Sequence, residues 1–534
     1  MKIINIFKKG TVTVALFVLL IPSLNAQLLS EQTFKIARLL GLIENFYIDT
    51  VDMEMVTRDA IVALLRSLDP HSAYIPADEV AEMNEPLLGN FEGIGIQFNI
   101  LNDTILVTAP IPGGPSEKVG IMPGDRIVTI EDEDVAGVSI TTTGVRNRLL
   151  GEKGTKVRVG VYRRGTDGIT EFTITRDKIP VNSLDASYMI DEETGYIKLN
   201  RFSMSTEDEF NEAVEKLRER GMKNIILDLR GNSGGVMAPA VAIADAFLSD
   251  DRMVVYLEGK SMDRQDFRSS SETSLADARV VVLTDEGSAS ASEILAGALQ
   301  DWDRGVVIGR RTFGKGLVQN GFTLTDGSMV RLTVARYYTP SGRSIQSPYA
   351  DGYDRYMEEF MSRYARGEQV SSVNIAFPDS LQAETLVNRR VVFGGGGIMP
   401  DLFIGADTTV FNSFYREVVR LGAITRFTLG YVDSNRSRLL AQYEDFDRFR
   451  RDFEFSDDER QQFIEVAGEA GVEISREQFQ AAEAELFRIM KGLVARDIWD
   501  MENYFMVINE EDPVIINALR IITDPEAYRD ALGY

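Results

Sequence analysis

The chain has 534 residues, too many for one ordinary hydrophobic core, so two to four domains are expected. Its formal net charge of −25 argues against nucleic acid or an anionic membrane surface as a partner. With no cysteine and a single histidine, His71, a cysteine nucleophile is excluded and a zinc site of histidines and cysteines is disfavoured.

The first 26 residues have the pattern of an export signal. A lysine-rich start precedes an apolar run at residues 11–21, which is too short to span a bilayer comfortably. Leu-Asn-Ala before Gln27 is a plausible cleavage site. We therefore expect an exported, periplasmic protein. The alternative is an uncleaved segment that anchors the chain in the inner membrane, facing the periplasm, and this is the only membrane contact we expect.

Residues 27–88 are predicted to form a helical region. Apolar side chains recur at helical spacing from Ile36 to Tyr47, and again from Met53 to Leu68. The Leu-Asp-Pro sequence at residues 68–70 is expected to stop the second helix, because proline disfavours the helical conformation of the residue before it.

Residues 89–178 change to short β-branched runs separated by glycine and proline. Strands are expected at residues 105–108, 126–130, 156–162 and 170–175. The string Gly93-Ile94-Gly95-Ile96, followed by Gly-Asp-Arg-Ile at 124–127, resembles a PDZ domain. Glycines there leave backbone N–H groups free for a terminal carboxylate, and an extended peptide can add to the sheet edge. These four residues are the expected peptide-binding residues, and a generic β module is the alternative.

Residues 179–405 alternate between strand and helix, which predicts an α/β layer. We expect strands at residues 195–200, 223–229, 253–257 and 279–284, and helices at 206–220 and 236–248. Arg-Gly-Asn-Ser-Gly-Gly at residues 230–235 lies at a strand-to-helix turn, where glycines allow positive φ. From the string alone, a plain connecting loop is an equal interpretation.

Residues 285–319 are predicted to form a turn, a helix and two strands. They place Ser290 at a helix start, beside free N–H groups that can stabilise an oxyanion, and Lys315 in a Gly-Lys-Gly turn. A buried lysine can be neutral and act as the base for a serine. The alternative is structural, because Ser290 and Glu293 also match a capping box and such a lysine is commonly solvated.

Residues 406–534 are predicted to be helical and acidic, with helices at residues 411–421, 436–453, 457–470 and 476–490. Their role is open between dimerisation, a platform for a partner and a cover over the active site.

Several strings occur in one order between about residues 30 and 405: LDPHSAYIP, LDLRGNSGG, GSASASEI with AGALQD, TFGKGLVQ and GGGGIMPD. Together they resemble the carboxyl-terminal processing peptidases, also called tail-specific proteases. The resemblance implies a crotonase-like or ClpP-like α/β core and an N-terminal helical region that can aid homodimer formation. It implies Ser290 as nucleophile, Lys315 as general base and Gln319 as the residue that orients the lysine. The backbone N–H groups of Gly235 (or Gly234) and Ala291 would form the oxyanion hole.

We therefore expect a multidomain α/β protein that binds apolar C-terminal tails of proteins through its PDZ domain and cleaves them as a serine endopeptidase. No metal or organic cofactor is implied. The expected parts are a signal peptide (1–26), a helical region (27–88), the PDZ domain (89–178), the peptidase core (179–405) and a helical extension (406–534). The alternatives are a scaffold that binds tails without cutting and, less favoured, a crotonase-type enzyme acting on acyl thioesters.

Overall fold

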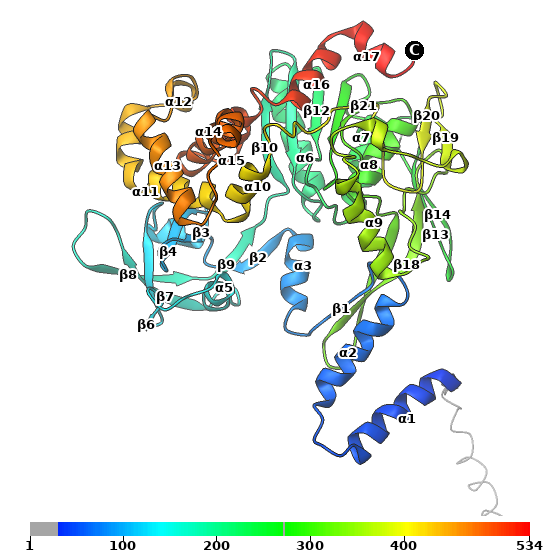
Figure 1. Cartoon of the computed structure of the whole chain (residues 1–534), viewed down its shortest axis with the longest axis horizontal. Coiled ribbons are helices and arrows are strands. Elements are labelled where there is room, and N and C mark those ends of the chain that lie inside the picture. Colours follow the sequence, from blue (N-terminus) through cyan, green and yellow to red (C-terminus); the bar gives the residue numbers. More distant parts are fainter. Residues whose placement is uncertain (1–29, 271–272) are drawn as a thin grey trace, which may run out of the picture. The chain divides into compact units, whose positions relative to one another are not determined.

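The computed structural model describes residues 30–270 and 273–534, so the expected signal peptide lies outside the described residues. The chain divides into two compact units, one ending at Leu68 and one running from Asp69 to Tyr534 (Figure 1). In neither described range is there a helix with the length and apolar character needed to cross a membrane.

From residue 30 onward, the first unit consists of two helices, α1 (Glu31–Phe46) and α2 (Met53–Arg66). Both begin with a side-chain cap: the N–H of Thr33 donates to Ser30 Oγ at 3.2 Å, and that of Met55 donates to Asp52 Oδ1 at 3.0 Å. The helical prediction for this segment is therefore correct, and α2 ends before Pro70 as expected.

The segment expected to be a PDZ domain, called the PDZ module below, contains a sheet in the order β3-β4-β5-β7-β8, with β6 paired to β5, and a separate pair of strands, β2 and β9. Its strands and helices are β2 (Asn90–Gly93), β3 (Ile96–Ile100), β4 (Ile105–Pro110), α4 (Pro115–Val119), β5 (Arg126–Ile130), β6 (Glu133–Asp134), α5 (Thr142–Leu149), β7 (Lys156–Tyr162), β8 (Ile169–Thr175) and β9 (Asp177–Pro180). The strands β4, β5, β7 and β8 lie where the sequence predicts them. Among the described strands, β3 pairs with β4 alone, so it is an outer strand of this sheet.

The segment expected to be the peptidase core is built on a six-stranded sheet in the order β10-β11-β12-β15-β16-β21, parallel except for β10. Its strands are β10 (Leu184–Met189), β11 (Thr194–Leu199), β12 (Asn224–Asp228), β15 (Arg279–Thr284), β16 (Val306–Gly309) and β21 (Leu402–Phe403). One face packs on α6 (Thr206–Glu219), α7 (Met237–Phe247) and α8 (Ala291–Asp301). This arrangement confirms the predicted α/β layer.

A second sheet joins β1 (Ala73–Ile75), β13 (Met253–Gly259), β14 (Met262–Arg268), β17 (Leu317–Thr323) and β18 (Met329–Tyr338). β1 lies in the segment 27–88, which the sequence predicts as helical only. It forms a strand there because its backbone pairs with β18, with Ala73 opposite Arg331. Between β1 and β2 runs α3 (Val80–Leu88), and after β18 follow α9 (Tyr353–Ala365) and the short pair β19 (Gln382–Glu384) and β20 (Val391–Phe393).

The C-terminal extension is helical throughout, as predicted. Its helices are α10 (Ser413–Arg420), α11 (Ala423–Gln442), α12 (Phe446–Asp452), α13 (Asp457–Glu469), α14 (Arg476–Ile498), α15 (Met501–Ile508), α16 (Pro513–Thr523) and α17 (Pro525–Ala531). The single helix predicted over 436–453 is wrong. The chain instead breaks at Tyr443, and Asp445 caps α12 by accepting the N–H of Arg448 at 2.8 Å.

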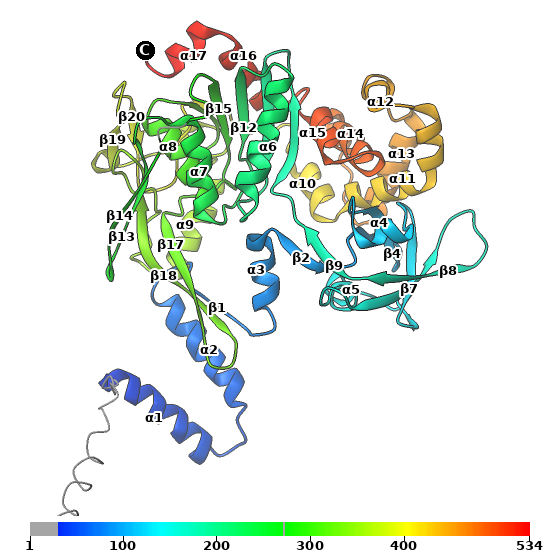
Figure 2. The ribbon, with the colours of Figure 1, turned by 180° about the vertical axis from the view of Figure 1, so that it is seen from behind.

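The helices α16 and α17 cover the second face of the six-stranded sheet (Figures 1 and 2). Side chains that alternate with those facing α6–α8, such as Ile226 and Val281, contact Ile515 and Ile522 in one apolar cluster. Parallel sheets are normally buried on both faces, so the end of the extension is a layer of the peptidase core.

Shortening Ile522 to alanine should destabilise the core, because this side chain is fully buried between α16 and the sheet. We expect Ile522→Ala to lower the free energy of unfolding by about 2–5 kcal/mol in urea denaturation. The control is Ile516→Ala on the same helix, where the side chain is 50% exposed and the change should stay within about 0.5 kcal/mol. Equal losses in the two variants would contradict the packing described here.

Candidate active site

Ser290 sits directly before α8, in a backbone conformation that non-glycine residues rarely adopt (φ 55°, ψ −112°). Such a conformation costs about 1–3 kcal/mol and persists only where surrounding contacts impose it. One contact is the hydrogen bond that the Ser290 N–H donates to Glu293 Oε2 at 2.8 Å. The serine is thereby fixed at the positive end of a buried helix, where negative charge on a reacting oxygen is favoured.

The Lys315 amine donates a hydrogen bond to Gln319 Oε1 at 2.9 Å. Gln319 in turn donates from Nε2 to the carbonyl oxygen of His71 at 2.6 Å, which fixes the orientation of its amide. Burial lowers the pKa of Lys315, and the nearby charge of Arg331 lowers it further. A lysine in this setting is suited to accept a proton.

Glu293 links the serine segment to the lysine turn. Its carboxylate is fully buried, and besides the Ser290 N–H it accepts the N–H groups of Lys315 at 2.9 Å and Gly314 at 2.8 Å, and the Thr312 hydroxyl at 2.5 Å. Burial raises the pKa of Glu293 to about 7, although these four donors oppose the rise. The capping residue expected from the sequence therefore also holds Lys315.

The hydroxyl of Tyr337 makes a second link, lying 2.7 Å from the Lys315 carbonyl oxygen and 3.1 Å from the Ser290 carbonyl oxygen. Within the described ranges no direct hydrogen bond joins the Ser290 hydroxyl to the Lys315 amine. The two residues are thus held together through their backbones, and their roles as nucleophile and base stay predictions.

The loop of residues 230–235, which we call the oxyanion loop because its Gly235 N–H is predicted to bind an oxyanion, lies against the serine. A Cβ on Gly234 would lie 2.8 Å from Ser290 Cβ and 2.9 Å from the Ala291 nitrogen, so this close approach requires glycine. The Gly234 N–H is occupied by Asn232 Oδ1 at 2.9 Å. The N–H groups of Gly235 and Ala291 donate no hydrogen bond to any described residue, so they are the donors available to an oxyanion.

The sequence distinguishes His71 only as the single histidine, and in the structure it lies beside Gln319, which holds the lysine. Its carbonyl holds Gln319, and its imidazole Nε2 lies 3.3 Å from the Tyr356 hydroxyl. Burial lowers the pKa of His71 to about 4, and the charge of Lys315 lowers it further. In the sequence, the LDPHSAYIP string marks the segment that contains His71. The string does not indicate that His71 contacts Gln319 and Tyr356.

The predicted peptide-binding residues lie where β2 passes into β3. The Ile94 carbonyl accepts the Ser116 N–H at 3.0 Å, and the Gly95 carbonyl accepts the Ile111 N–H at 3.0 Å. The N–H groups of Ile94 and Gly95 donate to no residue of the described ranges. These two donors, with Gly93 and Ile96 on either side, are therefore free to bind a carboxylate at the start of an outer strand.

Three family models match this chain. Peptidase family S41 matches residues 193–351, the PDZ domain matches residues 93–174, and a family of unknown function matches residues 414–500. The first lies within the core described above, and the second lies within the PDZ module.

Among curated proteins, the chain is 36% identical over 304 residues to the carboxy-terminal processing protease CtpA of Bacillus subtilis, covering 57% of this chain and 64% of that protein. It is 33% identical over 326 residues to a carboxy-terminal-processing protease of Bartonella bacilliformis, covering 60% of this chain and 74% of that protein. Among solved structures, the photosystem II D1 C-terminal processing protease is 30% identical, with a TM-score of 0.35, and the match covers 59% of this chain and 84% of that one. The match to CtpA thus spans slightly less than two thirds of that relative.

The buried Glu293 should make stability depend on pH. Its pKa in the folded chain, about 7, is above its ordinary value of 4.5, so the folded state binds the proton more tightly. The resulting stabilisation is complete below about pH 4.5 and is lost as the pH rises through 7; a difference of this size corresponds to about 3 kcal/mol. Between pH 5 and 8 the free energy of unfolding should therefore fall more in the native chain than in Glu293→Gln. Parallel curves for the two proteins would contradict this assignment.

Proposed function

Since the chain belongs to the carboxy-terminal processing proteases of peptidase family S41 and contains a PDZ domain, we propose that it is a serine endopeptidase that acts on protein C-termini. The observation on which the proposal rests is the buried link through Glu293, which holds Ser290 and Lys315 in one site. The Lys315 amine, oriented by Gln319, is placed in a setting that favours its neutral form.

In the proposed reaction, Ser290 Oγ attacks the scissile carbonyl carbon while its proton passes to Lys315 Nζ. The oxyanion that forms accepts hydrogen bonds from the N–H groups of Gly235 and Ala291. Lys315 then gives the proton to the leaving amine, the peptide bond breaks and an acyl-enzyme remains. Water, deprotonated by the same lysine, releases the acyl group and restores the serine.

The tail of the substrate would bind at the PDZ module. Its carboxylate would accept the free N–H groups of Ile94 and Gly95, and its backbone would add to β3 as a further strand. Because Ile96, next to these glycines, is only partly buried at the edge of the PDZ core, we propose apolar tails as ligands.

We further propose that the chain is exported to the periplasm, with an uncleaved inner-membrane anchor as the alternative. The lysine-rich start and the apolar run at residues 11–21 support this. We also propose a homodimer through the first unit, since α1 exposes Phe34, Leu39 and Phe46 by 60%, 56% and 79%.

Ser290→Ala and Lys315→Ala should each abolish turnover of an unfolded protein with an apolar tail, lowering kcat on the order of 10⁴-fold or more. The first change removes the nucleophile and the second removes the base, while both variants should still bind the tail. Cleavage can be followed by mass spectrometry of the released fragments.

Lys216→Ala, at an exposed position on α6, is the matched control and should cleave at the native rate. Retained turnover in either the Ser290 or the Lys315 variant would refute the proposed dyad. Tail binding by the native chain without turnover, and without labelling of Ser290 by a fluorophosphonate, would instead support the non-cleaving scaffold.

A further inference from the structure

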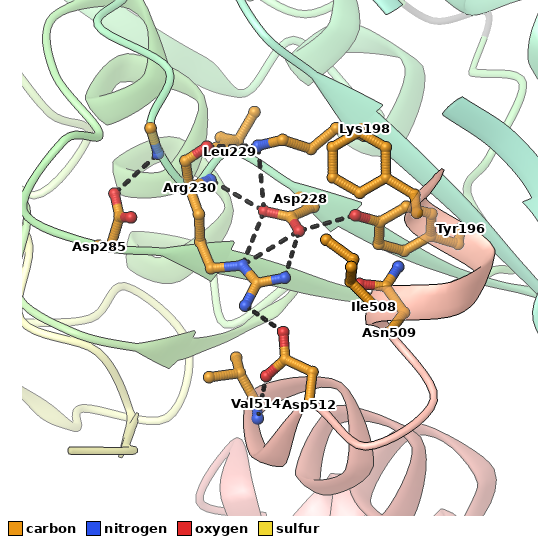
Figure 3. Close-up of polar contacts among 12 residues, drawn as sticks. Tyr196, Lys198, Asp228, Leu229, Arg230, Asp285, Ile508, Asn509, Asp512 and Val514 are labelled. Atoms are coloured by element: carbon orange, nitrogen blue, oxygen red, sulfur yellow. Dashed lines mark hydrogen bonds and ion pairs between the residues drawn. The ribbon is translucent and has the colours of Figure 1, made fainter. Parts of the chain in front are cut away.

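The oxyanion loop begins at Arg230, whose guanidinium is held from two sides (Figure 3). On one side Nε and Nη2 donate to Asp228 Oδ2 at 3.0 and 2.6 Å, at the end of β12. On the other side Nη1 donates to Asp512 Oδ2 at 2.6 Å. Asp512 belongs to the C-terminal extension, far along the chain from the peptidase motifs.

Asp512 adds a second carboxylate to the contacts of Arg230. Asp228 is fully buried, and it also accepts the Tyr196 hydroxyl at 2.8 Å and lies 3.4 Å from the Lys198 amine. Burial alone would raise the pKa of Asp228, but the charges of Arg230 and Lys198 outweigh it and hold the pKa well below its usual range, so this aspartate is ionised. Arg230 and Lys198 both face this buried anion, and Asp512 adds a negative charge next to Arg230.

The position of Asp512 is itself set by the packing of α16. Its Oδ1 accepts the N–H of Val514 at 2.8 Å and so caps this helix. The next residue, Ile515, is buried in the apolar cluster under the six-stranded sheet. The carboxylate is therefore a fixed anchor for Arg230.

Directly after Arg230, the loop is hydrogen-bonded to the segment that precedes Ser290. The N–H of Gly231 donates to Asp285 Oδ1 at 2.8 Å, and the carbonyl of Asn232 accepts the N–H of Ala289 at 3.0 Å. Its other end is fixed where the Phe202 N–H donates to the Gly234 carbonyl at 2.9 Å. A shift of Arg230 would therefore be transmitted along a short, tightly bonded segment to Gly235.

We propose that Asp512 is a positioning residue, through which the C-terminal extension sets the oxyanion loop by way of Arg230. The proposal deepens the function proposed above and rests on it, because the loop matters for catalysis only if Gly235 stabilises an oxyanion. It assigns the end of the extension a part in the reaction, beyond its part in covering the sheet.

The test compares Asp512→Asn with Glu502→Gln in the full-length chain. Asparagine is as good a helix cap as aspartate, so in Asp512→Asn the side-chain oxygen still caps α16. The amide nitrogen then replaces the oxygen that accepts Arg230 Nη1, so both the charge and the hydrogen bond facing Arg230 are lost. Glu502→Gln also neutralises a carboxylate of the extension that contacts the core, where it accepts the Ser187 N–H at 3.0 Å, but at the edge strand β10. Thermal unfolding should be similar in the two variants.

We expect Asp512→Asn to lower kcat roughly 10- to 100-fold with KM within about twofold of native, because misplacing a group that acts in the transition state has effects of that order. Inhibition by a peptide aldehyde, whose adduct with Ser290 places an oxyanion in the same hole, should weaken in parallel. Amide hydrogen exchange in residues 229–236 should become faster only in this variant. Glu502→Gln should match the native chain in all of these measurements.

The proposal is overturned if Asp512→Asn matches Glu502→Gln in kcat and in loop exchange. It is equally overturned if kcat falls only in proportion to the folded fraction, with exchange raised throughout the chain, since that pattern is a general loss of stability. If neither the native chain nor Glu502→Gln cleaves any tail-bearing protein, the proposed function fails, and the exchange of residues 229–236 alone then decides whether Asp512 positions the loop.

Discussion

The geometry around Ser290 and Lys315 depends on one buried carboxylate. Glu293 accepts backbone N–H groups from Ser290 and from the Gly314-Lys315 turn, two segments joined by a helix and a strand. Since a buried donor without a partner costs about 1–3 kcal/mol, loss of this carboxylate would leave several unpaired groups at once. The strained backbone of Ser290 is thus balanced by contacts made on both sides of the site.

The core that supports this site is completed by the C-terminal extension, which lies outside the sequence motifs of the peptidase family. One face of the parallel sheet is covered by helices that lie between its strands in sequence, and the other by α16 and α17 from the end of the extension. A helix that closes the sheet also brings Asp512 to Arg230, so the same packing contributes to stability and to the shape of the loop beside Ser290. The end of the extension is therefore a structural part of the core that carries Ser290.

Much of this arrangement follows from local sequence patterns. The strands β5, β7 and β15 coincide with runs of β-branched residues, and the turn that holds Lys315 lies where glycines flank it. What local patterns cannot show are contacts between distant segments. Glu293 matches a helix cap within its own segment, yet its link to Lys315 depends on how α8 packs against the turn. Similarly, the apolar spacing of residues 513–523 gives no indication that this helix packs against the central sheet.

The outer position of β3 has a consequence for which proteins can be recognised. Successive side chains of a chain paired with this strand would point to opposite sides of the sheet, so only every second residue of a tail would meet the PDZ surface. The residues between them would face solvent, and most of the affinity would come from main-chain atoms common to all proteins. Such a binding site would have broad specificity, because tails that differ in sequence but share the residues at every second position would bind alike.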